Sequence, residues 1–154
     1  MVTRMTSSEV AITNLLYRYA ETIDSGRFEE LAEDLFATAE FIVAPPPARR
    51  LSGPEMARLI ASTTIRHADG TPRTKHVVSN PIVEIDEQEG VARCRSYYTV
   101  FQKTDALSLQ PIVAGRYDDR FRRIDGEWRF AERDYTMIDM MGDVRQHLRM
   151  DPTA

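Results

Sequence analysis

His76 is the side chain of this sequence best suited to proton transfer, because an imidazole takes up and releases a proton near neutral pH. It lies in the run Arg73-Thr-Lys-His-Val-Val-Ser-Asn80, whose alternating residues are typical of a strand. On a strand His76 shares a face with Val78 and Asn80, which indicates a pocket wall. The alternative is a half-buried histidine bonded to a backbone carbonyl.

Asp24 is the candidate partner of His76. A carboxylate beside an imidazole fixes its tautomer and stabilises the imidazolium that forms on protonation. Asp24 stands at the end of an expected helix, directly before Ser-Gly, where an aspartate also commonly forms a turn. We therefore hypothesise that Asp24 and His76 meet in one pocket, with a structural turn as the alternative.

Two tyrosines compete for a place beside this pair. At about 100° per residue, Tyr19 and Asp24 point about 140° apart on a continuous helix, whereas Tyr17 lies nearly in line with Asp24. Tyr19 converges on Asp24 only if the helix ends before the aspartate. Core packing is the alternative for both tyrosines.

Arg133, on the last long strand, could stabilise an enolate, an oxyanion or a departing anion. A surface ion pair with Glu132 or Asp134 is the alternative. Substrate contacts are expected from the following residues: Tyr98, Phe101, Val78, Asn80 and Tyr117.

Other chemistries have little support in the sequence. His67 and His147 are expected to be solvated, and the acidic stretch from Glu84 to Glu89 lacks the spacing of a calcium loop. No phosphate-binding glycine loop, His-x-x-x-His pair or Gly-x-Ser-x-Gly elbow is present. We therefore expect neither a metal nor an organic cofactor.

Composition limits the class of protein. A chain of 154 residues fits one domain, taken as residues 1–154, and its net charge of −4 makes nucleic acid an unsuitable partner. Cys94 is the only cysteine, so no intrachain disulfide can form. Without a secretory signal or a long apolar run, a cytoplasmic protein that does not bind membranes is expected.

Helices are expected first along the chain. Thr6 and Glu9 form a possible capping box before an apolar stripe at helical spacing, and Ser25-Gly26 ends that helix. A shorter helix around Leu31 should pack antiparallel to it. A strand over residues 40–44 ends at prolines 45–47, and a second capping box, Ser52 to Glu55, opens a third helix.

Strands dominate the remainder. Four are expected, over residues 73–86, 91–103, 109–123 and 127–138, with a bend at Pro81 and a tight hairpin at Asp125-Gly126. Residues 139–150 could form an amphipathic tail helix. Helices followed by antiparallel strands predict an α+β domain with helices on one face of a curved sheet.

The sequence resembles the SnoaL-like branch of the nuclear transport factor two superfamily. The resemblance is carried by Leu-Leu-Tyr-x-Tyr-Ala-x-x-Ile-Asp24-Ser-Gly, by Arg73-Thr-Lys-His76, and by Gly126-Glu-Trp128-Arg-Phe, and it extends from about residue 8 to 138. It implies a cone-shaped, mixed but largely antiparallel sheet wrapped around three helices and enclosing an apolar pocket. It also implies a homodimer or homotrimer.

Within this branch the chain is most similar to scytalone dehydratase, bile-acid dehydratases and lindane dehydrochlorinase. The resemblance implies that Asp24 and His76 form a catalytic dyad, with Tyr19 and Arg133 completing the site. The strand of residues 91–103 has tyrosines where scytalone dehydratase has a second histidine, so scytalone itself is not the expected substrate.

Two functions follow from the resemblance. The first is a cofactor-independent lyase or isomerase that removes a proton from an apolar, ring-containing (polyketide- or steroid-like) molecule. The second is a non-catalytic subunit that binds a small ligand or supports assembly, like the small subunit of a ring-hydroxylating dioxygenase.

Overall fold

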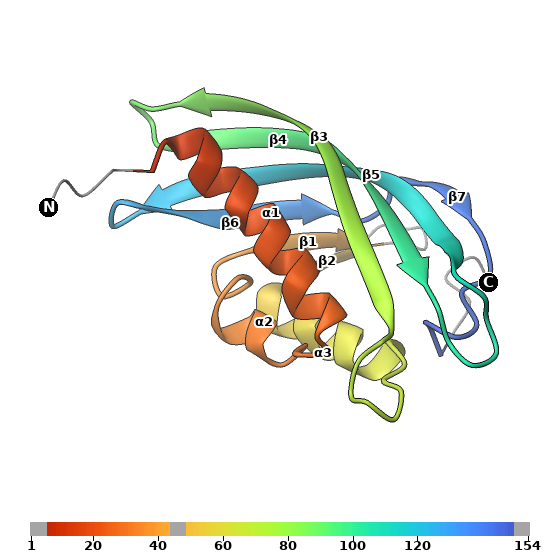
Figure 1. Ribbon diagram of the computed structural model, residues 1–154. Coiled ribbons are helices and arrows are strands. Elements are labelled where there is room, and N and C mark those ends of the chain that lie inside the picture. Colours follow the sequence, from red (N-terminus) through yellow and green to blue (C-terminus); the bar gives the residue numbers. More distant parts are fainter. Residues whose placement is uncertain (1–5, 44–48, 150–154) are drawn as a thin grey trace, which may run out of the picture.

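The computed structural model describes residues 6–43 and 49–149, in which three helices pack on one face of a strongly curved sheet (Figure 1). This arrangement confirms the α+β class and the helix-first order predicted from the sequence. No helix in the described ranges is long and apolar enough to cross a membrane. The strand break expected at residues 45–47 lies outside these ranges.

Helix α1 (Ser8–Asp24) crosses the sheet and buries the apolar stripe expected of it. Its N-cap is Ser7, whose hydroxyl accepts a hydrogen bond from the Val10 amide, so the expected cap at Thr6 is wrong by one residue. The helix continues through Asp24 and is capped by Ser25. Asp24 is its last residue, and this end of α1 lies at the lower end of the sheet in Figure 1.

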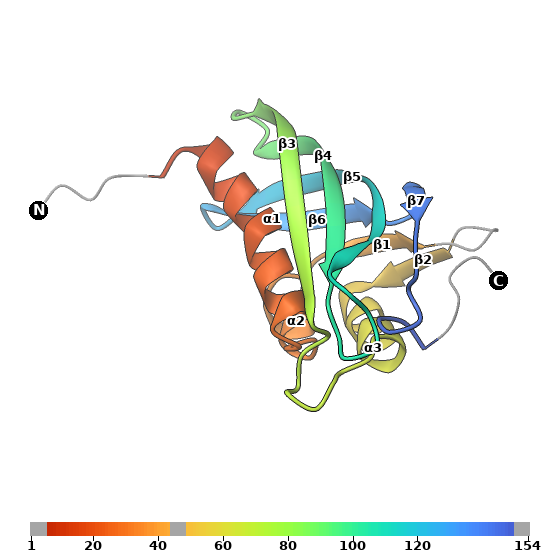
Figure 2. The same cartoon turned by 45° about the vertical axis from the view of Figure 1, so that its right-hand side comes forward.

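The other helices are short. Helix α2 (Glu30–Glu33) is a single turn, and α3 (Gly53–Thr63) begins with the predicted capping box between Ser52 and Glu55. The antiparallel pairing expected for α1 and α2 is wrong, because α2 packs mainly against α3. These two helices close the end of the sheet towards which α1 descends (Figure 2).

The sheet has seven strands: β1 (Glu40–Val43), β2 (Arg49–Ser52), β3 (Thr74–Asp86), β4 (Val91–Gln102), β5 (Gln110–Ile124), β6 (Glu127–Asp134) and β7 (Ile138–Met141). Their order is β2-β1-β6-β5-β4-β3, with β7 paired to β5. Only the pairing of β1 with β6 is parallel among these strands. The predicted mixed, largely antiparallel sheet is therefore confirmed, although β2 was not expected.

The tail helix expected over residues 139–150 is wrong for the part that the structure describes. Strand β5 is longer than its partner β6, and β7 pairs with the part of β5 that β6 leaves free. The chain beyond Met141 then runs back to the end of α3, where Thr64 and Leu148 form an isolated bridge (Figure 2). Residues 138–141 thus form a strand, because β5 offers backbone hydrogen-bond partners and the helical pattern of residues 139–150 is weak.

One contact between turns fixes the start of β3 beside the end of α1. Gly26 has a φ of 73°, and a Cβ atom there would lie only 2.1 Å from the carbonyl oxygen of Gly70. The turn after α1 therefore rests directly on the loop that leads into β3. Arg66 supports this contact by donating from Nε to the Gly26 carbonyl at 3.0 Å.

Two glycine substitutions separate the two constraints at this contact. Gly70 also has a positive φ of 79°, but a Cβ atom there would meet nothing within 4 Å. Gly70→Ala should lower the free energy of unfolding by about 1–2 kcal/mol through backbone strain alone. Gly26→Ala should cost a further 1–3 kcal/mol, approximately, because the Gly70 backbone must move. Urea unfolding of both variants measures the difference, and equal losses would contradict the close approach.

Candidate functional site

Asp24 holds the start of β3 through both of its carboxylate oxygens. Oδ1 accepts hydrogen bonds from the Thr74 hydroxyl at 2.8 Å and from Nδ1 of His76 at 2.7 Å. Oδ2 accepts the backbone amide of His76 at 2.8 Å. The structure thus brings together the aspartate and the histidine that the sequence singled out, 52 positions apart.

The environment of Asp24 determines the tautomer of His76. Burial by itself would raise the pKa of Asp24, but the hydrogen bonds from His76 and Thr74 outweigh it and hold the pKa below its usual value. The carboxylate is therefore ionised at neutral pH and can only accept, so Nδ1 of His76 carries the proton. In the neutral ring Nε2 is then the basic nitrogen.

His76 lies in the wall of an apolar cavity of about 250 Å³. Residues of α1, α3, β3, β4, β5 and β7 line the cavity, and Asp24 is not among them. Its apolar lining includes the following side chains: Ile23, Val43, Met56, Leu59, Ile60, Val100, Val113, Ile138, Met141, Val144 and Leu148. The His76 side chain thus lies at a mostly apolar chamber.

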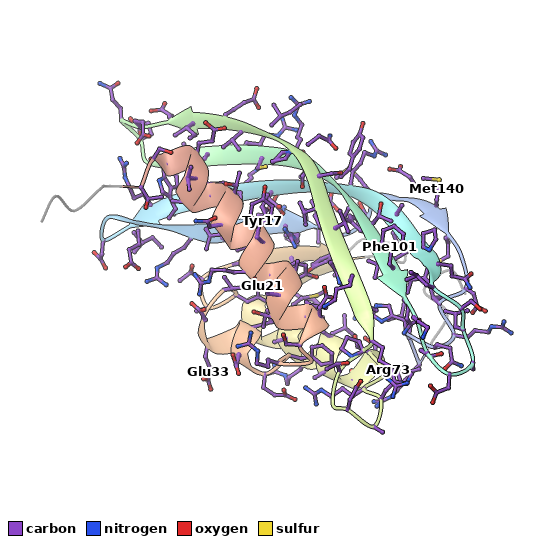
Figure 3. All side chains as sticks on the ribbon, in the orientation of Figure 1. Tyr17, Glu21, Glu33, Arg73, Phe101 and Met140 are labelled. Atoms are coloured by element: carbon purple, nitrogen blue, oxygen red, sulfur yellow. The ribbon has the colours of Figure 1, made fainter. Side chains whose placement is uncertain are left out.

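Tyr19 also lines this cavity. The sequence predicted that Tyr19 would approach Asp24 only if the helix ended before the aspartate, but α1 continues through Asp24. Tyr19 is 4 % exposed and its ring centroid lies 6.2 Å from that of His76. Tyr19 is therefore a neighbour of the His76 ring and not of the Asp24 carboxylate. Tyr17 is 44 % exposed on the outer side of α1 (Figure 3).

The Tyr19 hydroxyl accepts a hydrogen bond from the Tyr135 hydroxyl at 2.9 Å. Its own proton therefore remains available for a second partner. Burial raises the pKa of Tyr19, against the opposing effect of the Arg133 charge, so the phenol stays protonated at neutral pH. Tyr19 can thus act as a hydrogen-bond donor beside His76.

Arg133 is fully buried and pairs with Asp119 rather than with Glu132 or Asp134. Its Nε and Nη2 donate to the two carboxylate oxygens at 2.7 and 2.8 Å, a bidentate geometry typical of an ionised pair. Burial alone would lower the pKa of Arg133, but Asp119 raises it well above its usual value. Arg133 does not line the cavity.

The Arg133 guanidinium instead lies against the rings of Tyr117 and Tyr19, 3.9 and 4.3 Å from their centroids. A cation at this distance attracts the face of an aromatic ring and favours donation by its hydroxyl. Any influence of Arg133 on the cavity therefore passes through these tyrosines.

Only two of the five expected substrate contacts line the cavity. Tyr98 and Tyr117 do so, with their rings stacked at 4.3 Å between centroids. Val78 packs near α1, and Asn80 is exposed at the bulge of β3, where its φ is 41°. Phe101 lies on the face of β4 opposite to Tyr98 (Figure 3).

Sequence reasoning missed three polar side chains at the site. Thr74, on the His76 face of β3, could have been found from its two-residue spacing to the histidine. Tyr135 is next but one to Arg133, but the turn after β6 hides its direction. His147 was expected to be solvated, which is wrong: it is 8 % exposed and lines the cavity. No sequence pattern indicated that the final segment folds back.

A second concave surface lies at the other end of the sheet, near the β3–β4 turn, with a volume of about 870 Å³. Charged side chains line it, including Glu40, Arg93 and Glu132, which are engaged in surface ion pairs. Across residues 6–43 and 49–149, no three side chains of His, Cys, Asp or Glu are grouped as metal ligands would be.

Comparison with known proteins gives one family and many similar folds. The profile of the SnoaL-like domain matches residues 4–134. No curated protein matches significantly in sequence. Among solved structures, a protein of unknown function from Mycobacterium tuberculosis is 25 % identical, with a TM-score of 0.66 over 86 % of this chain and 72 % of that one.

Two further structures share the fold, both from Novosphingobium aromaticivorans. A provisionally assigned scytalone dehydratase is 23 % identical, with a TM-score of 0.65 and coverage of 86 % and 85 % of the two chains. The beta subunit of a provisionally assigned aromatic-ring-hydroxylating dioxygenase is 17 % identical, with a TM-score of 0.66 and coverage of 91 % and 95 %. At these identities the likeness concerns the fold.

Two neighbouring aspartates test the importance of the buried ion pair. Asp119→Asn leaves the Arg133 charge buried without a counter-charge and should lower the free energy of unfolding by about 3–5 kcal/mol. Asp118 pairs with Arg93 at the surface, so Asp118→Asn should cost at most about 1 kcal/mol. Urea unfolding gives both values, and a small loss for Asp119→Asn would show that the cation does not need its partner.

Proposed function

Because the chain belongs to the SnoaL-like domain family and holds a basic imidazole nitrogen at an apolar cavity, we propose that it is a cofactor-independent lyase or isomerase. The observation that carries the proposal is His76 at the cavity wall, with its Nδ1 2.7 Å from the carboxylate of Asp24. A carboxylate that fixes one nitrogen leaves the other as a general base.

The reaction begins with transfer of a proton from a carbon next to a carbonyl group to Nε2 of His76. The ionised Asp24 stabilises the resulting imidazolium through the same hydrogen bond. The electrons of the C–H bond move towards the carbonyl oxygen, which becomes enolate-like. Returning the proton to another carbon gives an isomer, and giving it to a hydroxyl group on the neighbouring carbon releases water.

Tyr19 stabilises the enolate-like oxygen in this scheme. Its hydroxyl accepts from Tyr135 and can donate into the cavity beside His76. Arg133, which lies against the Tyr19 ring, strengthens the phenol as a donor without touching the substrate. Arg133 is therefore proposed as a positioning residue, and Tyr19 as a catalytic one.

The cavity restricts the size of the substrate. A cavity of about 150 Å³ holds benzene, so one of 250 Å³ accommodates one substituted ring or a small bicyclic compound. A larger molecule, such as the steroid-like compound expected from the sequence, would extend beyond this volume through the open side of the cavity. The apolar lining excludes strongly charged molecules, since a buried charge without a partner is costly. The substrate class is thus a small, neutral cyclic ketone.

Proton exchange tests the base without knowledge of the natural leaving group. Incubated in D₂O with cyclohexanone, the protein should catalyse deuterium incorporation next to the carbonyl, observed by NMR. His76→Ala and Asp24→Asn should each lower this rate by about 10²–10⁴-fold. Lys75→Gln alters an exposed neighbour of His76 and serves as the control. Wild-type exchange no faster than buffer would refute the proposal.

The two tyrosines of α1 provide a matched test of the donor. Tyr19→Phe should slow exchange by about 10²-fold, because one donor to the enolate oxygen is lost. Tyr17→Phe removes an exposed hydroxyl on the same helix and should leave the rate unchanged. Equal rates for both variants would exclude Tyr19 from the reaction, and thermal unfolding establishes that both are folded.

An assembly subunit is the second candidate. It is supported by apolar side chains on the outer face of the sheet, where Ile82 and Tyr97 are 51 % and 55 % exposed. Sedimentation of the purified chain distinguishes the two: a stable homodimer or homotrimer, as predicted, favours the enzyme, and aggregation relieved only by a larger partner favours the subunit.

A further inference from the structure

His147 is a second imidazole at the cavity, and the dyad does not account for it. It lines the same cavity as His76, and the two ring centroids are 6.4 Å apart. Its side chain is almost fully buried, yet Nδ1 has no hydrogen-bond partner among the described residues. Leaving such a group unpaired costs about 1–3 kcal/mol, so the other contacts of this segment must offset that cost.

The main chain holds His147 firmly in position. Its carbonyl accepts the Ile65 amide at 2.8 Å, and the Arg149 amide donates to Thr63 at 2.8 Å. The carbonyl of the preceding Gln146 accepts from the buried amide of Gln102 at 2.9 Å. The segment is thus tied to the end of α3 and to β4, so the position of His147 is fixed before any substrate binds.

We propose that His147 binds the leaving oxygen of the substrate while His76 removes the proton. The geometry fits a shared oxygen atom, because two hydrogen bonds of about 2.8 Å to one oxygen span at most 5.6 Å, approximately. Because each ring nitrogen lies about 1 Å from its ring centroid, rings whose centroids are 6.4 Å apart can bring one nitrogen of each within that span. The inference rests on the proposed function and specifies its substrate as a ketone with a hydroxyl group on the second carbon from the carbonyl.

The sequence of bonds balances without another reactant. His76 takes the proton from the carbon next to the carbonyl, and the electrons of that bond are held as the enolate. When the enolate returns to a carbonyl group, its electrons form the new carbon–carbon double bond as the carbon–oxygen bond breaks, and the leaving oxygen keeps the electron pair of that bond. The imidazolium of His76 gives the same proton to this oxygen, so water and an unsaturated ketone leave while His147 donates a hydrogen bond throughout.

The protonation state of His147 suits a donor rather than a second base. Burial, reinforced by the nearby His76, lowers the pKa of His147 to about 4. The ring is therefore neutral at pH 7 and carries one N–H group. A neutral imidazole of low pKa can polarise an oxygen without taking the substrate proton.

Two ketones of similar size separate the roles of the histidines. Cyclohexanone can only exchange its protons, whereas 3-hydroxycyclohexanone can also lose water, which the ultraviolet absorbance of cyclohexenone reports. His147→Phe should lower the ratio of water loss to proton exchange about 100-fold. His147→Asn should recover part of the ratio, because its amide offers an N–H donor. Arg145→Ala, an exposed neighbour, should leave the ratio unchanged.

Binding gives a readout that is independent of turnover. In the His76→Ala protein labelled with ¹⁵N-histidine, 3-hydroxycyclohexanone should shift the ring nitrogen signals of His147, and cyclohexanone should not. This arm also tests the inference if His147→Phe does not fold.

The outcomes distinguish the two proposals. The role of His147 is overturned if a folded His147→Phe protein keeps the wild-type ratio of water loss to proton exchange. It is also overturned if the His147 nitrogen signals respond equally to the two ketones. Either result leaves the proposed function standing. Wild-type protein that catalyses neither reaction overturns both.

Discussion

The organisation of the site depends on the hydrogen bonds between one carboxylate, that of Asp24, and the first residues of β3. Asp24 accepts from a hydroxyl, a backbone amide and an imidazole, all on residues 74 and 76. These bonds position the strand as well as the ring, so the same contact contributes to folding and to chemistry. Because charge-assisted hydrogen bonds are stronger than neutral ones, the carboxylate fixes the ring more firmly than an amide would.

The buried pair of Arg133 and Asp119 has a comparable role on the other side of Tyr19. A guanidinium enclosed by aromatic rings is costly to bury, and the bidentate carboxylate offsets that cost. The result is a fixed positive charge directly behind the phenols that line the cavity. The cavity therefore contains no charged guanidinium, yet the potential of one acts on its wall.

Much of the fold was accessible from the sequence because it depends on local patterns. The apolar stripe of α1, the capping box at Ser52 and the hairpin at Asp125-Gly126 are each encoded within a few residues. The pairing of Asp24 with His76 was suggested by residue chemistry together with the family resemblance. Neither these local patterns nor the proposed pairing required knowledge of the strand register or of other long-range contacts.

Most of the features that were missed depend on long-range contacts. His147 is buried only because its segment returns to α3, and β7 exists only because β5 has a free length of edge. The face of Asn80 depends on the strand register, because the bulge after Ser79 changes that register along β3. Phe101 needed no such knowledge, since its three-residue spacing from Tyr98 already places the two side chains on opposite faces of β4. The partner of Arg133 likewise lies across β5, 14 positions away, rather than next to it in the sequence.

The flexible methionines of the cavity wall affect how the substrate preference of the protein can change during evolution. Met56 and Met141 come from α3 and β7, whereas the proton-accepting nitrogen is held by α1 and β3. An unbranched thioether side chain adapts its shape more readily than a branched one. Mutations in these two segments can therefore reshape the chamber for a new compound while the reactive group stays anchored, so that selectivity and reactivity are able to evolve as separate traits.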